Sequence, residues 1–349
     1  MNTTALKETI SALLADGKGI LAMDESNPTC NKRFAQNGIP ETEEARRSYR
    51  ELIITTPGLN EFISGAILYD ETLHQSAANG KSFVTLLHAA GIVPGIKVDM
   101  GAKDLALRPG EKITEGLDGL DARLSQYAQL GARFAKWRAV ITIGDNIPSA
   151  GCIQANAHAL ARYAALCQQN GIVPVVEPEV LMEGNHSLAK CLEVTQDVLH
   201  VVFAQLIEQG VVLEYMLLKP NMVLPGIKSQ NQESVNEVAE ATVNCFLRTV
   251  PAAVPGIAFL SGGQPYELAS ARLNAMNLKY RDRLPWALTF SFSRAIQQPA
   301  LEIWKGLEEN KSAAQQALYH RARCSSAARL GEYNASLEKD FSFPLALHE

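Results

Sequence analysis

The sequence predicts a single-domain α/β protein over residues 1–349, with the (β/α)8 architecture of a TIM barrel. Eight short apolar segments alternate with longer segments of helical composition along the chain. The apolar residues in these short segments are consecutive, which is typical of strands covered on both faces in a parallel sheet. No linker, low-complexity segment or charge block divides the chain, and α/β barrels of this length fold as one domain. Strand and helix that alternate eight times are the pattern of a (β/α)8 barrel.

The eight predicted strands are these apolar segments, and each ends in polar residues. In chain order they are GKGILAMDES from Gly17, EFISGAILYDE from Glu61, IVPGIKVDMG from Ile92, GARFAKWRAV from Gly131, GIVPVVEPEV from Gly171, EYMLLKPNM from Glu214, GIAFLSGGQ from Gly256 and PWALTFSFSR from Pro285.

Helices are predicted between these strands. The clearest begins at Asn156, where apolar residues recur at spacings of three and four, and it closes on Gly171, because glycine is a frequent helix stop. The other predicted helices are 41–53, 119–131, 186–209, 233–249 and 312–330. A helical extension is expected before the first strand, and a tail after the last helix.

The charge and hydropathy of the chain argue against two classes of partner. The net charge is −5, whereas a general nucleic-acid or membrane surface would favour a basic excess. No window of about 18 apolar residues occurs, and the N-terminus has no long apolar core behind a basic start. The sequence therefore predicts a cytoplasmic protein that binds neither nucleic acid nor membrane.

The cysteines and histidines give no sign of a metal site. Six cysteines and seven histidines are scattered along the chain, without CxxC, HxH, HxxH or HExxH spacing. We therefore expect reduced, structural thiols and no bound metal.

Polar residues gather at the carboxyl ends of the predicted strands, the face on which such barrels build their active sites. They are Asp24, Lys97, Lys136, Arg138, Glu177, Glu179, Lys219, Ser261, Ser291 and Arg294. Residues two apart in a strand share a face, so two pairs project together, one basic in FAKWR and one acidic in VVEPE. An ordinary ion-pair face is the alternative interpretation of each pair.

Three of these residues are lysines that could act as nucleophiles. A free lysine is almost wholly protonated at pH 7, so desolvation or a neighbouring cation must lower its pKa before its amine can attack a carbonyl. Asp99 would keep Lys97 charged, whereas Arg138 is expected to lower the pKa of Lys136. Lys219 has the most apolar sequence context, in LLKP. Lys219 is therefore the best candidate for a Schiff-base lysine, with Lys136 as a second cation across the barrel.

The acidic residues suit the remaining steps of Schiff-base chemistry. A carbinolamine must lose water to become an iminium, which requires a group that both donates and accepts protons. Glu177 fits this role if crowding by Glu179 raises its pKa. Cleavage of a carbon–carbon bond beta to the iminium also needs a base for the departing hydroxyl, and Asp24 at the tip of the first strand is available.

A phosphate site is predicted after strands seven and eight, where barrels commonly place one. The sequence LSGGQ offers Ser261 followed by Gly262 and Gly263, whose backbone N–H groups can surround an anion. Ser291 and Arg294 end the eighth segment, and a helix N-terminus at Arg294 would also favour an anion. A simple turn is the alternative interpretation of the glycine pair.

Taken together, these segments resemble the class I fructose-bisphosphate aldolases, the metal-free Schiff-base type. The matching stretches are GKGILAMDES, PGIKVDMG, GLDGL, GARFAKWR, VPVVEPE, LLKPNM, VPGIAFLSGGQ and LNAMN, in the order of the family. They extend from Gly17 to about Leu330, nearly the whole chain. The stretch ESNPTCNKR is more similar to the bacterial and plastid branch than to the animal branch.

The resemblance implies a role for each catalytic candidate. Lys219 would form the Schiff base with C2 of the ketose, and Glu177 would be the acid and base for carbinolamine dehydration. Glu179 would belong to the hydrogen-bond network of Glu177, and Asp24 would be the base at the C4 hydroxyl. Lys136 would stabilise charge that develops near the reacting carbons.

The resemblance also implies how substrate is held. Arg138 would contact the sugar. The residues implied for the phosphate on C1 are Ser261, Gly262 and Arg294, and those implied for the distal phosphate are Ser26, Arg33 and Lys97.

Three departures from the family pattern carry expectations of their own. Phe292 and Ser293 stand where the family usually has Tyr and then Gly or Ala, which should alter a local hydrogen bond but keep the phosphate-binding N–H. Met100 stands in KVDMG where lysine is commoner and removes a cation near the distal phosphate. The end FSFPLALHE lacks the family's C-terminal tyrosine, which should affect proton exchange at C3 and the preference for a bisphosphate, but not cleavage itself.

The function expected from the resemblance is reversible cleavage of fructose 1,6-bisphosphate to dihydroxyacetone phosphate and glyceraldehyde 3-phosphate, as in glycolysis and gluconeogenesis. No cofactor is expected, because the iminium is the electron sink that a zinc ion would otherwise provide. The expected partners are a small phosphosugar and further copies of the chain, in a tetramer. The alternatives are a transaldolase-like ketose transferase and a non-catalytic phosphosugar-binding scaffold.

Overall fold

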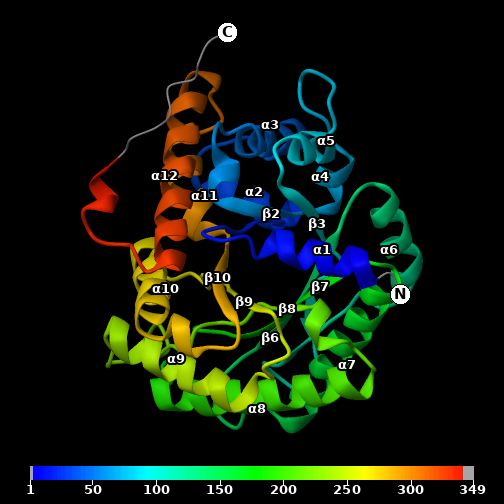
Figure 1. Cartoon of the computed structure of the whole chain (residues 1–349), viewed down its shortest axis with the longest axis vertical. Helices are drawn as coiled ribbons and strands as arrows, with labels where there is room; N and C mark the ends of the chain where they lie inside the picture. The colour runs from blue at the N-terminus through cyan, green and yellow to red at the C-terminus, as the bar shows by residue number, and fades with distance from the viewer. Residues whose placement is uncertain (1–2, 341–349) are drawn as a thin grey trace.

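A closed barrel of parallel strands forms the centre of the computed structural model, which describes residues 3–340 (Figure 1). The barrel strands are β1 (Gly19–Met23), β2 (Ile63–Leu68), β3 (Val93–Lys97), β6 (Phe134–Ile141), β7 (Val173–Val180), β8 (Leu217–Leu218), β9 (Gly256–Phe259) and β10 (Ala287–Phe292). Their order around the barrel is β1-β10-β9-β8-β7-β6-β3-β2, so each strand pairs with its neighbour in the chain and β1 closes on β10. Each predicted strand segment overlaps one of these strands, and the predicted (β/α)8 barrel is confirmed.

The α-helices surround this barrel in Figure 1. They are α1 (Thr3–Leu13), α2 (Asn27–Gln36), α3 (Glu43–Ile54), α4 (Asp70–His74), α5 (Phe83–Ala89), α6 (Leu120–Gln129), α7 (Ala150–Gln169), α8 (Leu188–Glu208), α9 (Val235–Thr249), α10 (Tyr266–Tyr280), α11 (Arg294–Trp304) and α12 (Lys311–Leu330). Short 3-10 helices are η1 (Leu59–Glu61), η2 (Leu213–Tyr215), η3 (Arg281–Arg283), η4 (Glu308–Asn310) and η5 (Leu337–Lys339). Within residues 3–340, no helix combines the length and apolar character needed to span a bilayer.

The six helices predicted at defined positions correspond to α3, α6, α7, α8, α9 and α12, and the predicted N-terminal extension to α1. Helix α7 begins at Ala150 rather than Asn156, because Ser149 accepts a hydrogen bond from the backbone N–H of Cys152 and caps the helix there. Helix α11 begins at Arg294, where the sequence predicts a helix N-terminus, and it continues through Pro299 to Trp304, although proline usually ends a helix. Two further strands, β4 (Ala102–Asp104) and β5 (Lys112–Thr114), form an antiparallel pair after β3.

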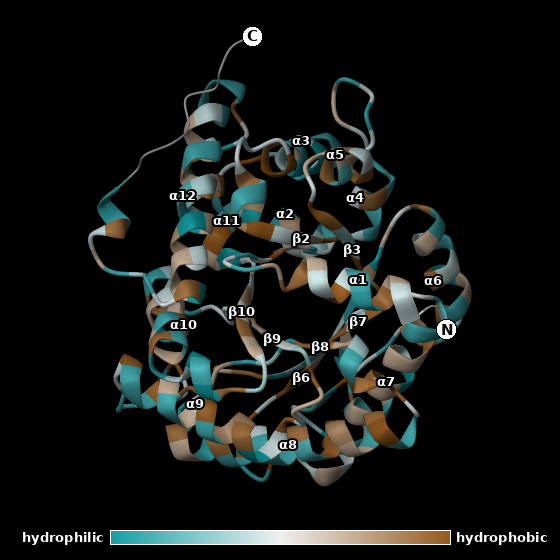
Figure 2. Cartoon of the chain, in the orientation of Figure 1, coloured by the Kyte–Doolittle hydropathy of each residue, from teal (hydrophilic) through white to brown (hydrophobic). Residues whose placement is uncertain are grey.

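The apolar core has two parts, one inside the barrel and one between the barrel and the helices. Helix α1 contributes Leu6, Ile10 and Leu13 to the inner part, where they pack with residues from the barrel strands, among them Ile20 and Phe134. The outer part forms one cluster, and Figure 2 shows strands rich in hydrophobic residues at the centre, with helices around them whose colours alternate between hydrophilic and hydrophobic. Helix α1 closes one end of the barrel with apolar side chains, and the polar carboxyl ends of the strands lie at the opposite end.

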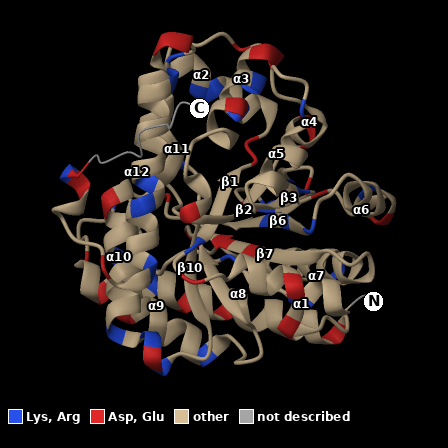
Figure 3. Cartoon of the chain, turned by 45° about the horizontal axis from the view of Figure 1, so that its top comes forward, with Lys and Arg blue, Asp and Glu red and all other residues tan. Residues whose placement is uncertain are grey.

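Strand register places the predicted polar residues side by side. Lys97 of β3 is level with Lys136 of β6, and Arg138 of β6 is level with Glu177 of β7. The backbone N–H of Lys219 donates to the carbonyl of Val176 in β7. Figure 3 shows the basic segment on β6 next to the acidic segment on β7. The pairs that the sequence predicted on separate strands therefore meet.

Candidate active site

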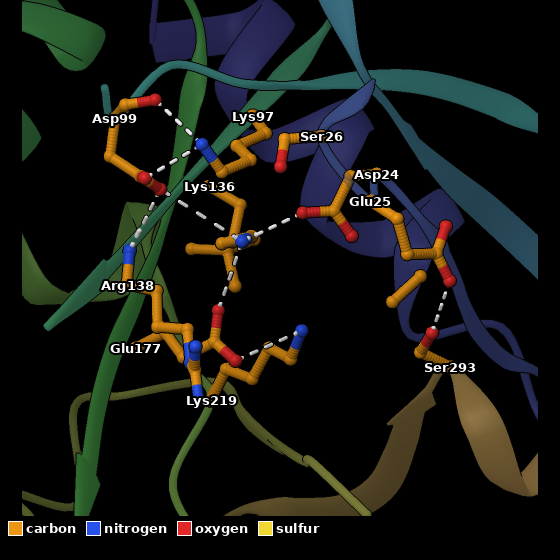
Figure 4. A network of polar contacts seen from close by, with 12 residues as sticks. Asp24, Glu25, Ser26, Lys97, Asp99, Lys136, Arg138, Glu177, Lys219 and Ser293 are labelled. Atoms are coloured by element: carbon orange, nitrogen blue, oxygen red, sulfur yellow. Dashed lines mark hydrogen bonds and ion pairs between the residues drawn. The ribbon is translucent and has the colours of Figure 1, made fainter. Parts of the chain in front are cut away.

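A cleft of about 220 Å³ opens at the carboxyl ends of the barrel strands. Most of the residues predicted for the site line it: Asp24, Ser26, Lys97, Lys136, Arg138, Glu177, Glu179, Lys219, Ser261, Gly262, Ser291 and Arg294. The two other predicted residues, Gly263 and Arg33, lie just outside its lining. The structure thus brings together side chains from strands that are far apart in sequence (Figure 4).

Lys219 lies at the base of the cleft and is buried, with 3% of its surface exposed. Its Nζ is 3.2 Å from Oε1 of Glu177, its single carboxylate neighbour within 4 Å among the described residues. Lys219 directly follows strand β8, which is only two residues long, and Pro220 directly follows Lys219. The ammonium that the sequence places after an apolar run is therefore at the centre of the polar cluster and has a specific partner.

Lys136 is surrounded by three carboxylates. Its Nζ is 2.7 Å from Oδ2 of Asp24, 3.4 Å from Oε2 of Glu177 and 3.9 Å from Oδ2 of Asp99. Burial alone would lower the pKa of this lysine, but the negative charges outweigh burial and raise the pKa above its ordinary value. The expectation that Arg138 lowers the pKa of Lys136 is therefore wrong, because the nearest charges are acidic.

Arg138 itself is paired with Glu179. Its Nε donates to Oε2 of Glu179, and although burial opposes ionisation, this carboxylate helps to raise the pKa of the guanidinium. With 43% of its side chain exposed, Arg138 still reaches the open part of the cleft. The pair of glutamates that the sequence placed on one face is thereby divided between two cations, since Glu177 contacts the lysines and Glu179 contacts Arg138.

Asp99 is a residue of this cluster to which the sequence analysis gave no role in the site. It is 7% exposed, its Oδ1 is 2.7 Å from Nζ of Lys97, and its Oδ2 accepts from the backbone N–H of Arg138 at 3.2 Å. The signal was present, because Asp99 follows the third predicted strand just as Asp24 follows the first. The sequence alone indicates for Asp99 only a partner that keeps Lys97 charged.

The predicted phosphate loop also lies against the cleft. Gly262 and Gly263 both have positive φ angles, 57° and 86°, a conformation that favours glycine. A Cβ atom at Gly263 would lie 2.8 Å from Nη2 of Arg294, so only glycine lets this guanidinium pack on the loop. Arg294 is exposed and has no ion-pair partner within residues 3–340. The loop therefore offers glycine backbone N–H groups beside the guanidinium of Arg294, and both can bind an anion.

Glu25 is a second polar residue that the sequence analysis missed. It follows Asp24 and ties the first strand to the eighth, because Oε1 of Glu25 accepts from the hydroxyl of Ser293 at 2.8 Å (Figure 4). Arg33 and Arg50 also pair with Glu25, and although burial opposes ionisation they lower its pKa. Ser293 thus fixes the segment that leads into Arg294, whereas Arg33 points at Glu25.

A second cavity, of about 620 Å³, adjoins the cleft on the side of β3. The two share Ser26, Thr29, Lys97 and Arg138. Arg123 and Met100 lie further along the wall, and Met100 is 65% exposed. The predicted distal residues Ser26 and Lys97 therefore stand at a passage between two spaces.

One group outside the cleft has the composition of a metal site. His320, Cys324 and Glu338 bring one ligand atom each within 4.8 Å of one another. However, Glu338 already pairs with Arg321 and accepts from the hydroxyl of Tyr333 at 2.7 Å. A guanidinium at the carboxylate disfavours a second cation there, so we assign this group to the packing of the C-terminal segment against α12.

The charge of Asp24 predicts a specific loss of stability in acid. Burial would raise its pKa, but Lys136 and the other lysines lower the pKa from 3.8 to about 2. Because the pKa is lower in the folded state, the carboxylate stabilises the fold above about pH 4, and this contribution of about 2 kcal/mol is lost as the pH falls toward 2.

Urea unfolding of the wild type and of Asp24→Asn between about pH 6 and pH 3 measures this effect. The difference between their free energies of unfolding should shrink on acidification. Glu25 is present in both proteins and cancels in the comparison. A difference that is independent of pH would contradict this assignment.

Comparison with known proteins gives one consistent family. Residues 5–343 match the family model described as fructose-bisphosphate aldolase class-I. A relative from Xanthomonas axonopodis pv. citri, a probable fructose-bisphosphate aldolase class 1, is 55% identical over 95% of this chain and 99% of its own length. Cytosolic fructose-bisphosphate aldolase 4 of Arabidopsis thaliana is 50% identical over 95% of this chain and 84% of its own.

A solved structure agrees with these relatives. Fructose-bisphosphate aldolase from Plasmodium falciparum, crystallised with TRAP and a small-molecule inhibitor, superposes with a TM-score of 0.93. It is 48% identical and covers 95% of this chain and 96% of its own.

Proposed function

The chain belongs to the class I fructose-bisphosphate aldolase family, and we infer that it reversibly cleaves fructose 1,6-bisphosphate to dihydroxyacetone phosphate and glyceraldehyde 3-phosphate through a Schiff base on Lys219. The observation that carries this assignment is the difference between the two buried lysines. Among residues 3–340, Lys136 has three carboxylates within 4 Å, whereas Lys219 has only Glu177. A neutral amine is the nucleophile in Schiff-base formation, so the lysine with fewer anions beside it suits that task.

Formation of the Schiff base uses the contact between Lys219 and Glu177. The amine adds to the C2 carbonyl of the ketose and gives a carbinolamine, whose hydroxyl must leave as water. Glu177, 3.2 Å from the lysine nitrogen, is placed to donate that proton and to take one back when water returns. The product is an iminium, which accepts the electron pair released by the next step.

Cleavage then requires a base on the far side of the substrate. Asp24 accepts the proton of the C4 hydroxyl, the C3–C4 bond breaks, the aldehyde leaves, and the bonding electrons pass into an enamine on Lys219. Lys136, held 2.7 Å from Asp24, remains charged because its carboxylate neighbours raise its pKa. Its positive charge is therefore available to oppose the negative charge that develops at these carbons. Protonation of the enamine at C3 and hydrolysis of the resulting iminium release dihydroxyacetone phosphate.

The two phosphates would be held at opposite ends of the cleft. We place the C1 phosphate at the loop of Ser261, Gly262 and Gly263 with Arg294, because the loop exposes backbone N–H groups beside a cation. The distal phosphate is placed at Ser26 and Lys97, where the cleft meets the larger cavity. We also propose a homotetramer, as the resemblance implies, and a cytoplasmic location, as the hydropathy of the sequence indicates. Light scattering on the purified protein measures the oligomeric state.

A coupled assay for triose phosphates tests the function. Fructose 1,6-bisphosphate should yield both trioses, and EDTA should leave the rate unchanged, because the iminium supplies the electron sink. Added acceptor aldehydes should not be needed for turnover. Release of triose only in the presence of an acceptor would instead indicate a transferase, and no release at all would indicate a binding protein.

A further inference from the structure

Arg272 is a buried cation for which the proposed reaction has no use. It lies on α10, is 6% exposed, and donates from Nη1 to Oε1 of Gln264 at 2.7 Å. Its Nε is buried and has no hydrogen-bond partner within residues 3–340, and no carboxylate lies within 4 Å of the guanidinium there. Burial without a nearby anion lowers the pKa of this arginine.

The other buried arginines of residues 3–340 are satisfied differently. They are Arg46, Arg50, Arg321 and Arg329. The first three each pair with a carboxylate, and Arg329 donates to three backbone carbonyls. Arg272 alone among these five relies on one neutral side-chain acceptor. An unpaired buried charge is costly, so its presence calls for an anion that comes from outside the chain.

The partner of Arg272 connects it to the cleft. Gln264 directly follows Gly263, and its backbone N–H donates to the carbonyl of Ser261 at 3.0 Å, which closes the turn that holds both glycines. The side-chain carbonyl of Gln264 accepts from Arg272, and its amide nitrogen lies 3.8 Å from the sulfur of Met222. The guanidinium of Arg294 packs against the same loop at Gly263. The loop therefore lies between two cations, and neither has an ion-pair partner among the described residues.

We propose that Arg272 is a positioning residue for substrate phosphate, which braces the loop 261–264 through Gln264 and whose charge is balanced by the phosphate dianion when substrate binds. This inference rests on the proposed function, since it takes that loop as the C1 phosphate site. The protein without ligand retains an uncompensated buried charge, and ligand binding relieves it. The buried charge thereby lowers the stability of the ligand-free protein and raises its affinity for phosphate.

Arg272→Met tests this role with dihydroxyacetone phosphate and dihydroxyacetone as the two ligands. We expect the Kd for the phosphorylated ligand to rise about tenfold, with the Kd for the unphosphorylated ligand unchanged. KM for fructose 1,6-bisphosphate should rise while kcat stays within about twofold, because the reacting residues are untouched. The urea midpoint of the free variant should be equal to or higher than that of the wild type.

Four further variants separate the outcomes. Arg272→Lys keeps the charge and should restore most of the affinity. Arg272→Gln replaces Arg272→Met if the latter does not fold. As a control, Lys279→Met removes an exposed cation from the same helix. Equal losses of affinity for both ligands, or a lowered urea midpoint in both the Met and the Lys variants, would show a purely structural role and overturn the proposal. Arg294→Ala tests the phosphate site itself. If this variant binds dihydroxyacetone phosphate with an unchanged Kd, the placement of that phosphate is wrong. If Arg294→Ala binds it more weakly but Arg272→Met binds it as the wild type does, only the role of Arg272 is refuted.

Discussion

Lys219→Met is expected to reduce kcat for fructose 1,6-bisphosphate by at least about 10⁴-fold. Methionine matches the length and apolar stem of the lysine at a site that is only 3% exposed, so packing should survive while the amine is lost. Without that amine no iminium forms, and the electrons of the C3–C4 bond have no acceptor. The coupled triose-phosphate assay measures the loss.

Borohydride trapping in the presence of dihydroxyacetone phosphate identifies the amine directly. The wild type should be labelled at Lys219, and Lys219→Met should not be labelled at Lys136 in its place, because the carboxylates around Lys136 raise its pKa and keep it charged. Lys279→Met is the matched control for loss of a lysine at an exposed position. Undiminished triose production by Lys219→Met would refute the Schiff-base assignment.

Lys136→Met is expected to impair both stability and activity. Asp24, Glu177 and Asp99 all lie within 4 Å of its ammonium and are buried, so removal of that charge leaves carboxylates that repel one another. Removing one partner of a buried ion pair costs about 3 kcal/mol or more of unfolding free energy. The rate should fall by about 10²-fold or more, because the charge that opposes the developing negative charge is lost.

The pH dependence separates this explanation from simple loss of packing. The stability deficit of Lys136→Met in urea unfolding should be largest near neutral pH and should shrink in acid, as the crowded carboxylates take up protons. Lys136→Arg keeps the charge and should recover part of the stability. A deficit that is the same at pH 7 and at about pH 4 would indicate a packing defect instead.

These two lysines also show how far sequence reasoning reached. The strands were predictable because a continuous apolar run is a local property, and the site residues were predictable because each follows such a run. Lys219 was identified by its apolar neighbours in sequence. The direction of the pKa shift of Lys136 was not predictable in this way. Its nearest charge in sequence is Arg138, whereas its nearest charges in space are Asp24, just after β1, and Glu177, on β7.

The predicted helices followed the same division. The predictions for α8 and α9 agree with the structure to within about two residues at each end. The start of α11 at Arg294 was also predicted, but its extent was not, since tertiary packing supports the helix beyond Pro299, where local propensity opposes it. The departure predicted for the C-terminal residues FSFPLALHE lies outside the described residues.

The sequence alone determined the barrel class, the face on which the site lies and most of the residues in the site. All three depend on short-range patterns of apolar and polar residues. Only the tertiary structure decided which charges neutralise one another. Closure of the barrel sets Asp24 beside Lys136, divides Glu177 and Glu179 between different cations, and leaves Arg272 without a carboxylate partner among residues 3–340. Electrostatic energy depends on distances through space in a buried environment, and a linear sequence does not contain those distances.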